Sequence, residues 1–412
     1  MSRIVLSTIG THGDFVAFVG LGRALAARGH DVVVAVNPAA VPLFRAAGLA
    51  TAPCGSRYGP EEARSHRALF DEWRGGRPSR ELLHQIFDLE GNYHALAGLC
   101  RGADLLVAIS LQLAAPRVHD ALGIPWVAVS LLPGEIGTRA AALRDSLPRP
   151  EGLRPLPNGY LFLEYLRAPR ILLASSRHFH GDAVSSFEGL CTTGFWFHDD
   201  PEQASWRPPP DVEQFMREGD APIVLTFGSL PVDDAARIVS LHQQAAREVG
   251  MRLLVQRGWG DLSLADASHG DVRDVLVAGQ LPHDWLFPRS AAVVHHGGIG
   301  VTARALKHRC PMLVEPYGRD QFFNAYRIVQ LGVGVAMHPH QLTVRGLCQA
   351  FTRLQSDHVR GRVAEVAEHI DADGGGIDRA CDLIESYLRT AGSPAVPSPP
   401  PPRPKGVSHE RT

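Results

Sequence analysis

Residues 291–306 read AAVVHHGGIGVTARAL, and this stretch decides the fold. The apolar run up to Val294 is typical of a buried strand, and apolar residues at helical spacing follow the glycines. The stretch therefore predicts a strand, a tight turn at Gly297, Gly298 and Gly300, and a helix. Such a turn directs backbone N–H groups and the positive end of a helix dipole at one point, which suits a phosphate. For an isolated glycine cluster, an ordinary strand-to-helix turn is the alternative.

The same alternation of strand and helix runs through the chain. Short apolar runs, typical of parallel strands buried on both faces, occur at 4–9, 31–37, 104–109 and 126–130, and again at 222–227, 252–256, 275–278, 291–295 and 311–315. A chain of 412 residues is long enough for two domains. We expect an α/β protein with two doubly wound parallel-sheet domains, residues 1–205 and 206–390, facing across a cleft. The proline-rich residues 391–412 predict a disordered tail.

Composition narrows the possible functions. The hydrophobic share of 45% and the charged share of 20% are those of an ordinary folded enzyme. A formal net charge of -2 gives no basic field for nucleic acid, so we expect no such partner. The six cysteines have no metal-like spacing, which favours free thiols in a reducing cytoplasm. No signal-like region and no long apolar run is apparent, so we expect a cytoplasmic protein without membrane insertion.

The glycine-rich stretch also resembles a family signature. His295 to Gly300, followed by Asp320 and Gln321, is similar to the signature of bacterial nucleotide-sugar glycosyltransferases with two Rossmann-like domains, the GT-B type. The resemblance extends to residues 226–229, 279–283 and 9–14, and covers nearly the whole chain except the tail. Within the family, the chain looks similar to antibiotic and macrolide glycosyltransferases, enzymes of secondary metabolism, and to rhamnosyltransferases of the rhamnolipid type. The G-x-G-x-x-G spacing of a dinucleotide site is absent from both glycine turns, which argues against a nicotinamide oxidoreductase.

The resemblance implies a set of donor-binding residues. His295 and the backbone amides of the turn would hold the diphosphate, Ser229 would assist, the Leu281 backbone would meet the base, and Asp320 and Gln321 would bind sugar hydroxyls. The full set is Ser229, Leu281, His295, Gly297, Gly298, Ile299, Gly300, Val301, Asp320 and Gln321. A carboxylate and an amide can together bond vicinal hydroxyls, although Asp320 at a helix start is also a typical cap.

The sequence departs from the family pattern at two positions. Val301 stands where the signature has threonine, so the hydroxyl that would donate a hydrogen bond to the phosphate is missing. Thr302 or backbone amides would have to compensate. Gln280 stands where relatives often place an aromatic ring against the nucleobase, which leaves the choice between a uridine and a thymidine donor open.

The reaction implied by the resemblance needs a base for an acceptor hydroxyl. Asp14 follows the turn after the first strand, where open α/β sheets place ligands, and it matches an aspartate of the family. His12 is the rival base, because imidazole titrates near neutral pH, and Asp14 could instead only cap a helix. With Asp14 or His12 as the base, a single displacement inverts the anomeric carbon. The expected partners are a UDP- or TDP-sugar and a small, apolar natural-product or lipid acceptor.

Several alternatives stay open. A catalytically silent homologue acting as a binding or activator subunit, or a nucleotide-sugar epimerase, would share this architecture. Residues 66–87, which include Phe70 and Trp73, would line an apolar acceptor pocket or contact a membrane surface. Neither the isolated histidine pairs, at 178–180 and 338–340, nor Asp371-Ala372-Asp373 has a convincing metal-site pattern. We therefore expect no metal and no cofactor, with amides and a helix dipole neutralising the leaving diphosphate.

Overall fold

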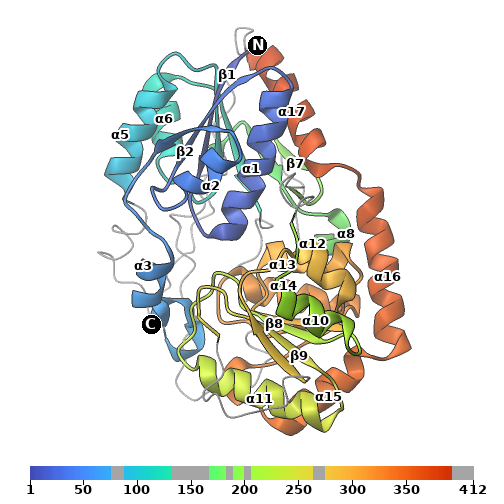
Figure 1. Ribbon diagram of the computed structural model, residues 1–412. Coiled ribbons are helices and arrows are strands. Elements are labelled where there is room, and N and C mark those ends of the chain that lie inside the picture. Colours follow the sequence, from blue (N-terminus) through green and yellow to red (C-terminus); the bar gives the residue numbers. More distant parts are fainter. Residues whose placement is uncertain (76–87, 132–166, 182–188, 199–205, 263–273, 392–412) are drawn as a thin grey trace, which may run out of the picture.

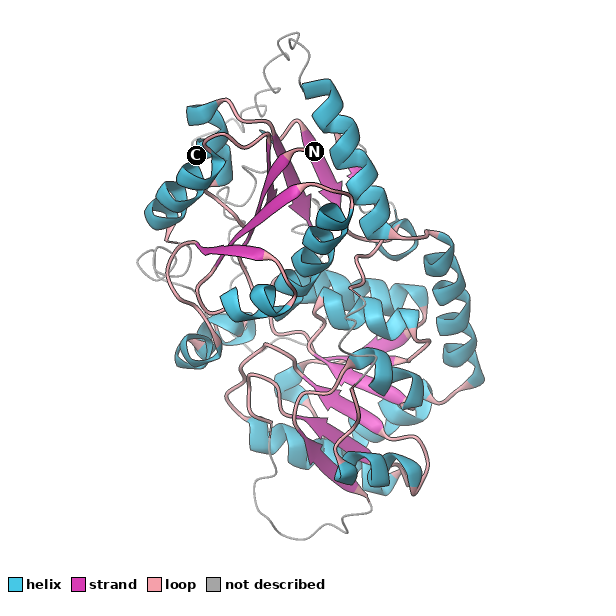
Figure 2. Ribbon diagram, turned by 45° about the horizontal axis from the view of Figure 1, so that its top comes forward, coloured by secondary structure: helices cyan, strands magenta, loops and turns pink. Residues whose placement is uncertain are grey.

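The computed structural model describes residues 1–75, 88–131, 167–181, 189–198, 206–262 and 274–391. It contains two parallel sheets with helices packed around them, one above the other in Figure 1. Figure 2 shows the same two layered units with a helix-lined boundary between them. The prediction of two doubly wound α/β domains is confirmed.

The first sheet has seven strands in the order β3-β2-β1-β4-β5-β6-β7. Its strands are β1 Arg3–Thr8, β2 Asp31–Val36, β3 Ala50–Pro53, β4 Leu105–Ile109, β5 Trp126–Ser130, β6 Arg170–Leu173 and β7 Leu190–Thr192. The helices in this part of the chain are α1 His12–Ala27, α2 Val41–Ala46, α3 Pro60–Ser65, η1 Arg67–Phe70, η2 Glu72–Arg74, α5 Leu89–Cys100, α6 Ala115–Leu122 and α8 Arg177–His180. Of these, α8 packs against the second domain, where Phe179 enters the core.

The second sheet has six strands in the order β10-β9-β8-β11-β12-β13. Its strands are β8 Ile223–Thr226, β9 Leu253–Gln256, β10 Val275–Ala278, β11 Ala292–His295, β12 Met312–Val314 and β13 Gly334–Ala336. The helices that follow the first domain are α10 Pro210–Arg217, α11 Ala235–Glu248, α12 His283–Leu286, η5 Phe287–Arg289, α13 Ile299–Lys307, α14 Asp320–Leu331, η6 Pro339–Gln341, α15 Val344–Leu354, α16 Asp357–Ala372 and α17 Gly376–Ala391.

The apolar strand runs form cores on both faces of each sheet. In β1, Ile4 and Leu6 pack into the cluster beneath α1, whereas Val5 packs into the cluster beneath α5 and α6. All three side chains are fully buried, because successive residues of a strand point to opposite faces and helices cover both. The continuous apolar runs of the sequence are therefore explained by two-sided burial.

Along the described ranges, the chain passes from one domain to the other twice. At the first crossing, after β7, Phe195 packs into the core of the second domain while the adjacent Trp196 packs into the core of the first. At the second, α16 runs along the second domain and α17 returns to the first, as the red helices of Figure 1 show. Ile384 of α17 packs into the core beneath α1, although the expected boundary groups residues 376–390 with the second domain. Arg28 at the end of α1 also pairs with Asp382, at 2.6 Å.

The packing of α17 predicts a stability effect. Replacing Ile384 with alanine should lower the free energy of unfolding by about 2–5 kcal/mol, because a fully buried side chain is lost from the first domain's core. Urea denaturation followed by circular dichroism measures it. Arg389→Ala, at an exposed position of the same helix, should change stability by less than about 0.5 kcal/mol. Equal stability of the two variants would contradict the packing described here.

Candidate active site

The candidate site lies where the strand order of the second sheet changes direction. β8 and β11 pair in parallel, with Thr226 opposite His295 at their carboxyl ends. The chain continues from β8 to β9 on one side and from β11 to β12 on the other, so the turns after these strands diverge. Such a crevice is the usual ligand site of an open α/β sheet. It brings the turn containing Ser229, which is half-buried, beside the glycine-rich turn after β11.

Two glycines of this turn lie in places that admit no side chain. Gly297 has a φ of 95°, and a Cβ there would lie 2.9 Å from Val314 Cγ1 and 3.2 Å from the Gln321 carbonyl oxygen. A Cβ on Gly298 would lie 2.6 Å from Nε2 of His296. Gly298 is the N-cap of α13, and among the described residues no side-chain cap hydrogen bond is made to the helix start. The turn therefore presents free helix N–H groups to an anion.

The two histidines of the turn differ in their surroundings. The ring of His295 is fully buried, and its Nδ1 accepts a hydrogen bond from the Gly297 amide at 3.1 Å. His296 lies against the turn after β8, with Cε1 3.7 Å from the position of a Cβ on Gly228. Burial lowers the pKa of His295 well below its ordinary value and that of His296 to about 4. Both rings are therefore neutral at pH 7, and His295 shapes the turn from within the core.

The hydroxyl missing at Val301 is not replaced by Thr302. Val301 is buried in the core of the second domain. The Thr302 hydroxyl is also buried and donates to the Gly298 carbonyl at 3.0 Å, one helical turn back. The suggested compensation by Thr302 is therefore wrong. Ile299, beside them, packs against the cores of both domains.

Asp320 and Gln321 open α14 beside the glycine turn. Asn324 links Asp320 to the glycine turn. Its Nδ2 donates to Asp320 Oδ2 at 3.2 Å and to the Gly297 carbonyl at 2.8 Å. The Gln321 side-chain oxygen accepts from the backbone amides of Tyr317 and Gly318, at 2.7 and 3.2 Å. The carbonyl end of Gln321 thus holds the preceding loop, which leaves its NH₂ group as the end suited to a ligand.

Asp14 approaches this region from the first domain. Its Oδ2 accepts the Thr11 amide at 2.7 Å, so the cap interaction expected as an alternative is present. The carboxylate lies over Gly10, where a Cβ would be 2.2 Å from Oδ2. At the same helix start, Gly13 Cα lies 3.9 Å from the position of a Cβ on Gly300. The amino ends of α1 and α13 therefore meet across the domain boundary.

The carboxyl groups of Asp14 and Asp320 both have raised pKa values. Burial raises the pKa of Asp14 to about 6. Burial, and then the negative charge of Asp14, raise the pKa of Asp320 to about 7. The amino ends of α1 and α13 meet in the same region, so carboxyl groups of both domains contribute to its charge.

His12 faces a different part of the second domain. Its Nε2 lies 3.5 Å from Nε2 of Gln280, and burial followed by the nearby Arg304 lowers its pKa. The neighbouring Leu281 is buried, and its carbonyl accepts from Gln256 at 3.1 Å. His12 therefore lies beside the loop expected to hold the base, whereas Asp14 lies beside the loop expected to hold the sugar.

The other candidates from the sequence are the metal-site residues, the cysteines and the segment 66–87. Among the described residues, no group of three His, Cys, Asp or Glu side chains could hold a metal ion. All six cysteines lie in the described ranges and are free thiols. Trp73 is buried in the core of the second domain, so the prediction that it lines an acceptor pocket or a membrane surface is wrong, and residues 76–87 lie outside the described ranges. No described helix has the length and apolar character required to cross a bilayer.

Comparison with known proteins relates this geometry to two groups of enzymes. Residues 263–381 match the family model described as Erythromycin biosynthesis protein CIII-like, C-terminal domain. The chain is 30% identical to the O-mycaminosyltylonolide 6-deoxyallosyltransferase of Streptomyces fradiae, over 94% of this chain and 98% of that protein. It is 28% identical to the sterol 3-beta-glucosyltransferase UGT80B1 of Arabidopsis thaliana, over 96% of this chain and 69% of that protein. The sterol 3-beta-glucosyltransferase of Candida albicans is longer, and the chain spans 28% of it.

Solved structures share the fold. The glycosyltransferase SsfS6 of Streptomyces sp. SF2575, complexed with thymidine diphosphate, has a TM-score of 0.60 to this structure at 22% identity. The match covers 94% of this chain and 100% of that one.

The glycine turn predicts a contrast between two alanine variants. Gly297→Ala should lower the free energy of unfolding by about 1–3 kcal/mol and abolish binding of uridine and thymidine diphosphates, because a Cβ there meets Val314 and forces a left-handed residue. Gly300→Ala should leave the free energy of unfolding unchanged or slightly higher, since its Cβ would touch only Gly13, at an ordinary van der Waals distance. Chemical denaturation and calorimetry measure these effects. A stable, diphosphate-binding Gly297→Ala variant would contradict the role assigned to the turn.

Proposed function

The chain belongs to the glycosyltransferases of GT-B architecture that include macrolide and other antibiotic glycosyltransferases, and from this premise we propose an inverting transfer of a sugar from a UDP- or TDP-sugar to an acceptor hydroxyl. The observation that carries the proposal is the meeting of the amino end of α1, which bears Asp14, with the glycine turn at the start of α13. A base from one domain and sugar- and phosphate-binding groups from the other then meet at one point.

The reaction proceeds in a single displacement. The Asp14 carboxylate removes the proton of the acceptor hydroxyl, and the resulting oxygen nucleophile attacks the anomeric carbon. The bond from that carbon to the diphosphate oxygen breaks with inversion. The Gly297 amide is engaged by His295, so the amides of residues 298–300 and the positive end of α13 receive the negative charge of the leaving nucleoside diphosphate.

The assignment of Asp14 as the base is supported by its position and its acidity. A pKa of about 6 leaves the carboxylate ionised at neutral pH, yet makes it a stronger base than an exposed aspartate. His12 contacts Gln280 in the loop proposed to hold the nucleobase. Its place therefore suits contact with the nucleotide, while Asp320 and the NH₂ group of Gln321 bond the sugar hydroxyls.

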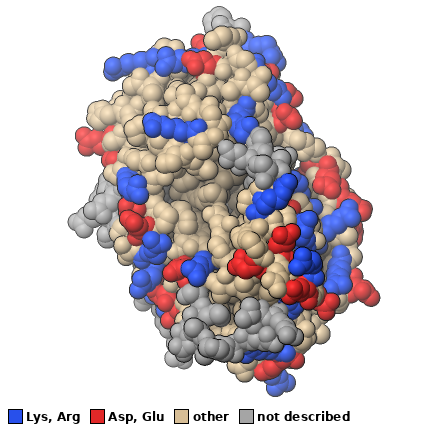
Figure 3. Space-filling model, in the orientation of Figure 1, with Lys and Arg blue, Asp and Glu red and all other residues tan. Residues whose placement is uncertain are grey.

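We propose a small, apolar acceptor. The two groups of relatives are named for a macrolide and for sterols, both largely apolar molecules with hydroxyl groups. On the face seen in Figure 3, the surface is hollowed between the two domains and carries few charged side chains there. An apolar ligand would bury its surface in such a hollow.

Two substitutions test the identity of the base. Asp14→Asn should lower kcat by about 10²–10⁴-fold with nucleoside diphosphate binding retained, because only proton removal is lost. His12→Ala should weaken nucleotide binding and retain most of kcat. Transfer from UDP-glucose and TDP-glucose to a sterol and to a macrolide aglycone, followed by mass spectrometry, measures both. If Asp14→Asn retained turnover and His12→Ala abolished it, the base would be His12.

The acidity of Asp14 predicts the pH profile. The base must be ionised, and burial raises its pKa, so activity should be full above the raised pKa and fall as the pH drops through about 6. An exposed aspartate would lose activity only near pH 4. The dependence of kcat/KM on pH between 4 and 9 measures this midpoint. A midpoint near 4 would show that the reacting base is not the buried Asp14.

A further inference from the structure

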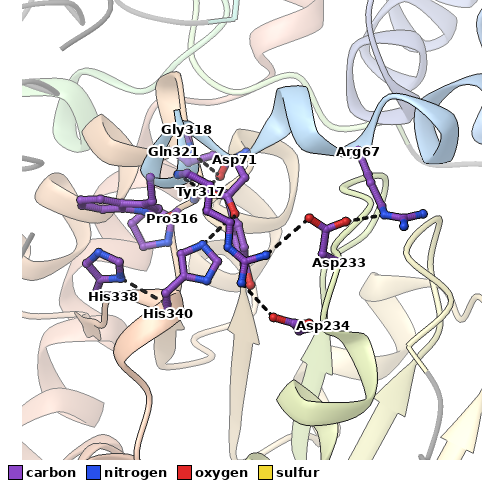
Figure 4. A network of polar contacts seen from close by, with 12 residues as sticks. Arg67, Asp71, Asp233, Asp234, Pro316, Tyr317, Gly318, Gln321, His338 and His340 are labelled. Carbon is purple, nitrogen blue, oxygen red and sulfur yellow. Dashed lines mark hydrogen bonds and ion pairs between the residues drawn. The ribbon is translucent and has the colours of Figure 1, made fainter. Parts of the chain in front are cut away.

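A short arm of the first domain reaches into the second. The arm consists of residues 67–75, which form the two 3-10 turns η1 and η2. Figure 4 shows it above the carboxyl ends of the second sheet, where it meets the loop that leads to Asp320 and Gln321. This loop, residues 316–319, follows β12 and is called the sugar loop below.

Trp73 anchors the arm. Its side chain is only 2% exposed, and its Nε1–H donates to the Pro316 carbonyl at 2.6 Å. The indole ring packs 4.0 Å from the ring of His338 and 5.1 Å, edge to face, from Phe322 of α14. Burial lowers the pKa of His338 to about 4, so the indole rests on a neutral ring. A residue of the first domain therefore completes the core beneath the sugar loop.

Glu72 contacts the next residues of the sugar loop. Its backbone amide donates to the Tyr317 carbonyl at 2.9 Å, and its Oε1 accepts the Arg319 amide at 2.7 Å. Between these contacts a Cβ on Gly318 would lie 3.0 Å from Glu72 Cγ. Together with the bond from Trp73, the arm satisfies backbone groups of three residues of a four-residue loop.

The sugar loop has a conformation that needs such support. Arg319 has a φ of 56°, in the left-handed region that residues with a side chain rarely adopt. The loop is held on its inner side by Gln321, whose side-chain oxygen accepts the amides of Tyr317 and Gly318. The arm holds the same loop from the outer side. The backbone immediately before Asp320 is therefore fixed jointly by both domains.

Polar pairs also fix the arm to the second domain. Asp71 accepts from His340 at 2.7 Å, and Arg74 pairs with Asp234 at 2.9 Å. Arg67 pairs with Asp233 at the outer end of the arm. The pairs of Arg67 and Arg74 are largely exposed and contribute little free energy, so they orient the arm. Trp73 and Asp71 supply its buried contacts.

We propose that Glu72 and Trp73 are positioning residues that set the affinity for the donor sugar, because they hold the loop from which Asp320 and Gln321 reach it. The inference rests on the proposed function of this site as a nucleotide-sugar site. It assigns part of the donor-sugar subsite to the first domain, so the sugar is bound tightly only with the arm seated. The nucleoside diphosphate, held by the glycine turn, does not depend on the arm.

The test separates sugar binding from nucleotide binding. Trp73→Phe keeps the aromatic packing and removes the donor to Pro316, while Glu72→Ala removes the acceptor for Arg319. Each should raise KM for UDP-glucose or TDP-glucose about fivefold to tenfold, the loss expected for one hydrogen bond, with kcat and the inhibition constant of the free diphosphate within about twofold of wild type. Glu72→Gln, which keeps an acceptor oxygen, should restore the wild-type KM. Arg67→Ala, in the same arm but remote from the sugar loop, should change nothing.

Hydrogen–deuterium exchange supplies a second readout that needs no donor. Exchange in residues 316–325 should quicken in Trp73→Phe and Glu72→Ala, with residues 295–305 unchanged. Unchanged exchange at 316–325, a parallel loss of diphosphate affinity, or the same effects in Arg67→Ala would overturn the inference. A wild-type protein that binds neither diphosphate would instead contradict the proposed function, and the exchange comparison would still decide whether the arm positions the loop.

Discussion

The parallel pairing of β8 with β11 sets the geometry of the donor half of the molecule. These two strands lie where the sheet order reverses, so the chain leaves them in opposite directions and their turns open a crevice. At this point the Gly297 carbonyl accepts a hydrogen bond from the Asn324 side chain, which also donates to Asp320. The segments proposed to bind the sugar and the phosphate are thereby fixed to one another through the amide side chain of Asn324.

Two helix amino ends meet at the domain boundary, and their positive dipoles repel each other. The amino ends of α1 and α13 face one another, and two positive dipole ends repel unless negative charge lies between them. Asp14 and Asp320 supply carboxyl groups there, but burial raises the pKa of both and limits how much charge they carry. A diphosphate entering the crevice would supply the missing negative charge, so donor binding and domain closure should favour each other.

The sequence predicts the fold and the principal loops well, because both depend on local patterns. Buried strands give apolar runs, and the glycines at 297 and 298 mark places without room for a Cβ. The contacts between domains could not be predicted in this way. Trp73 follows no periodic pattern that would assign it to the core of the other domain, and α17 is separated in sequence from α1, which it covers. The sequence also could not predict that His12 and Asp14, two positions apart, have different surroundings in the second domain.

The two crossings of the chain limit how the domains can move. The alternation of Phe195 and Trp196 between the two cores ties the first crossing to both domains, and α16 and α17 form the second. Because the chain joins the domains at these two places, and the arm with the buried Trp73 adds a third contact, neither crossing can act as a free swivel. A single cut in the backbone at one crossing would therefore leave the two domains joined by the other.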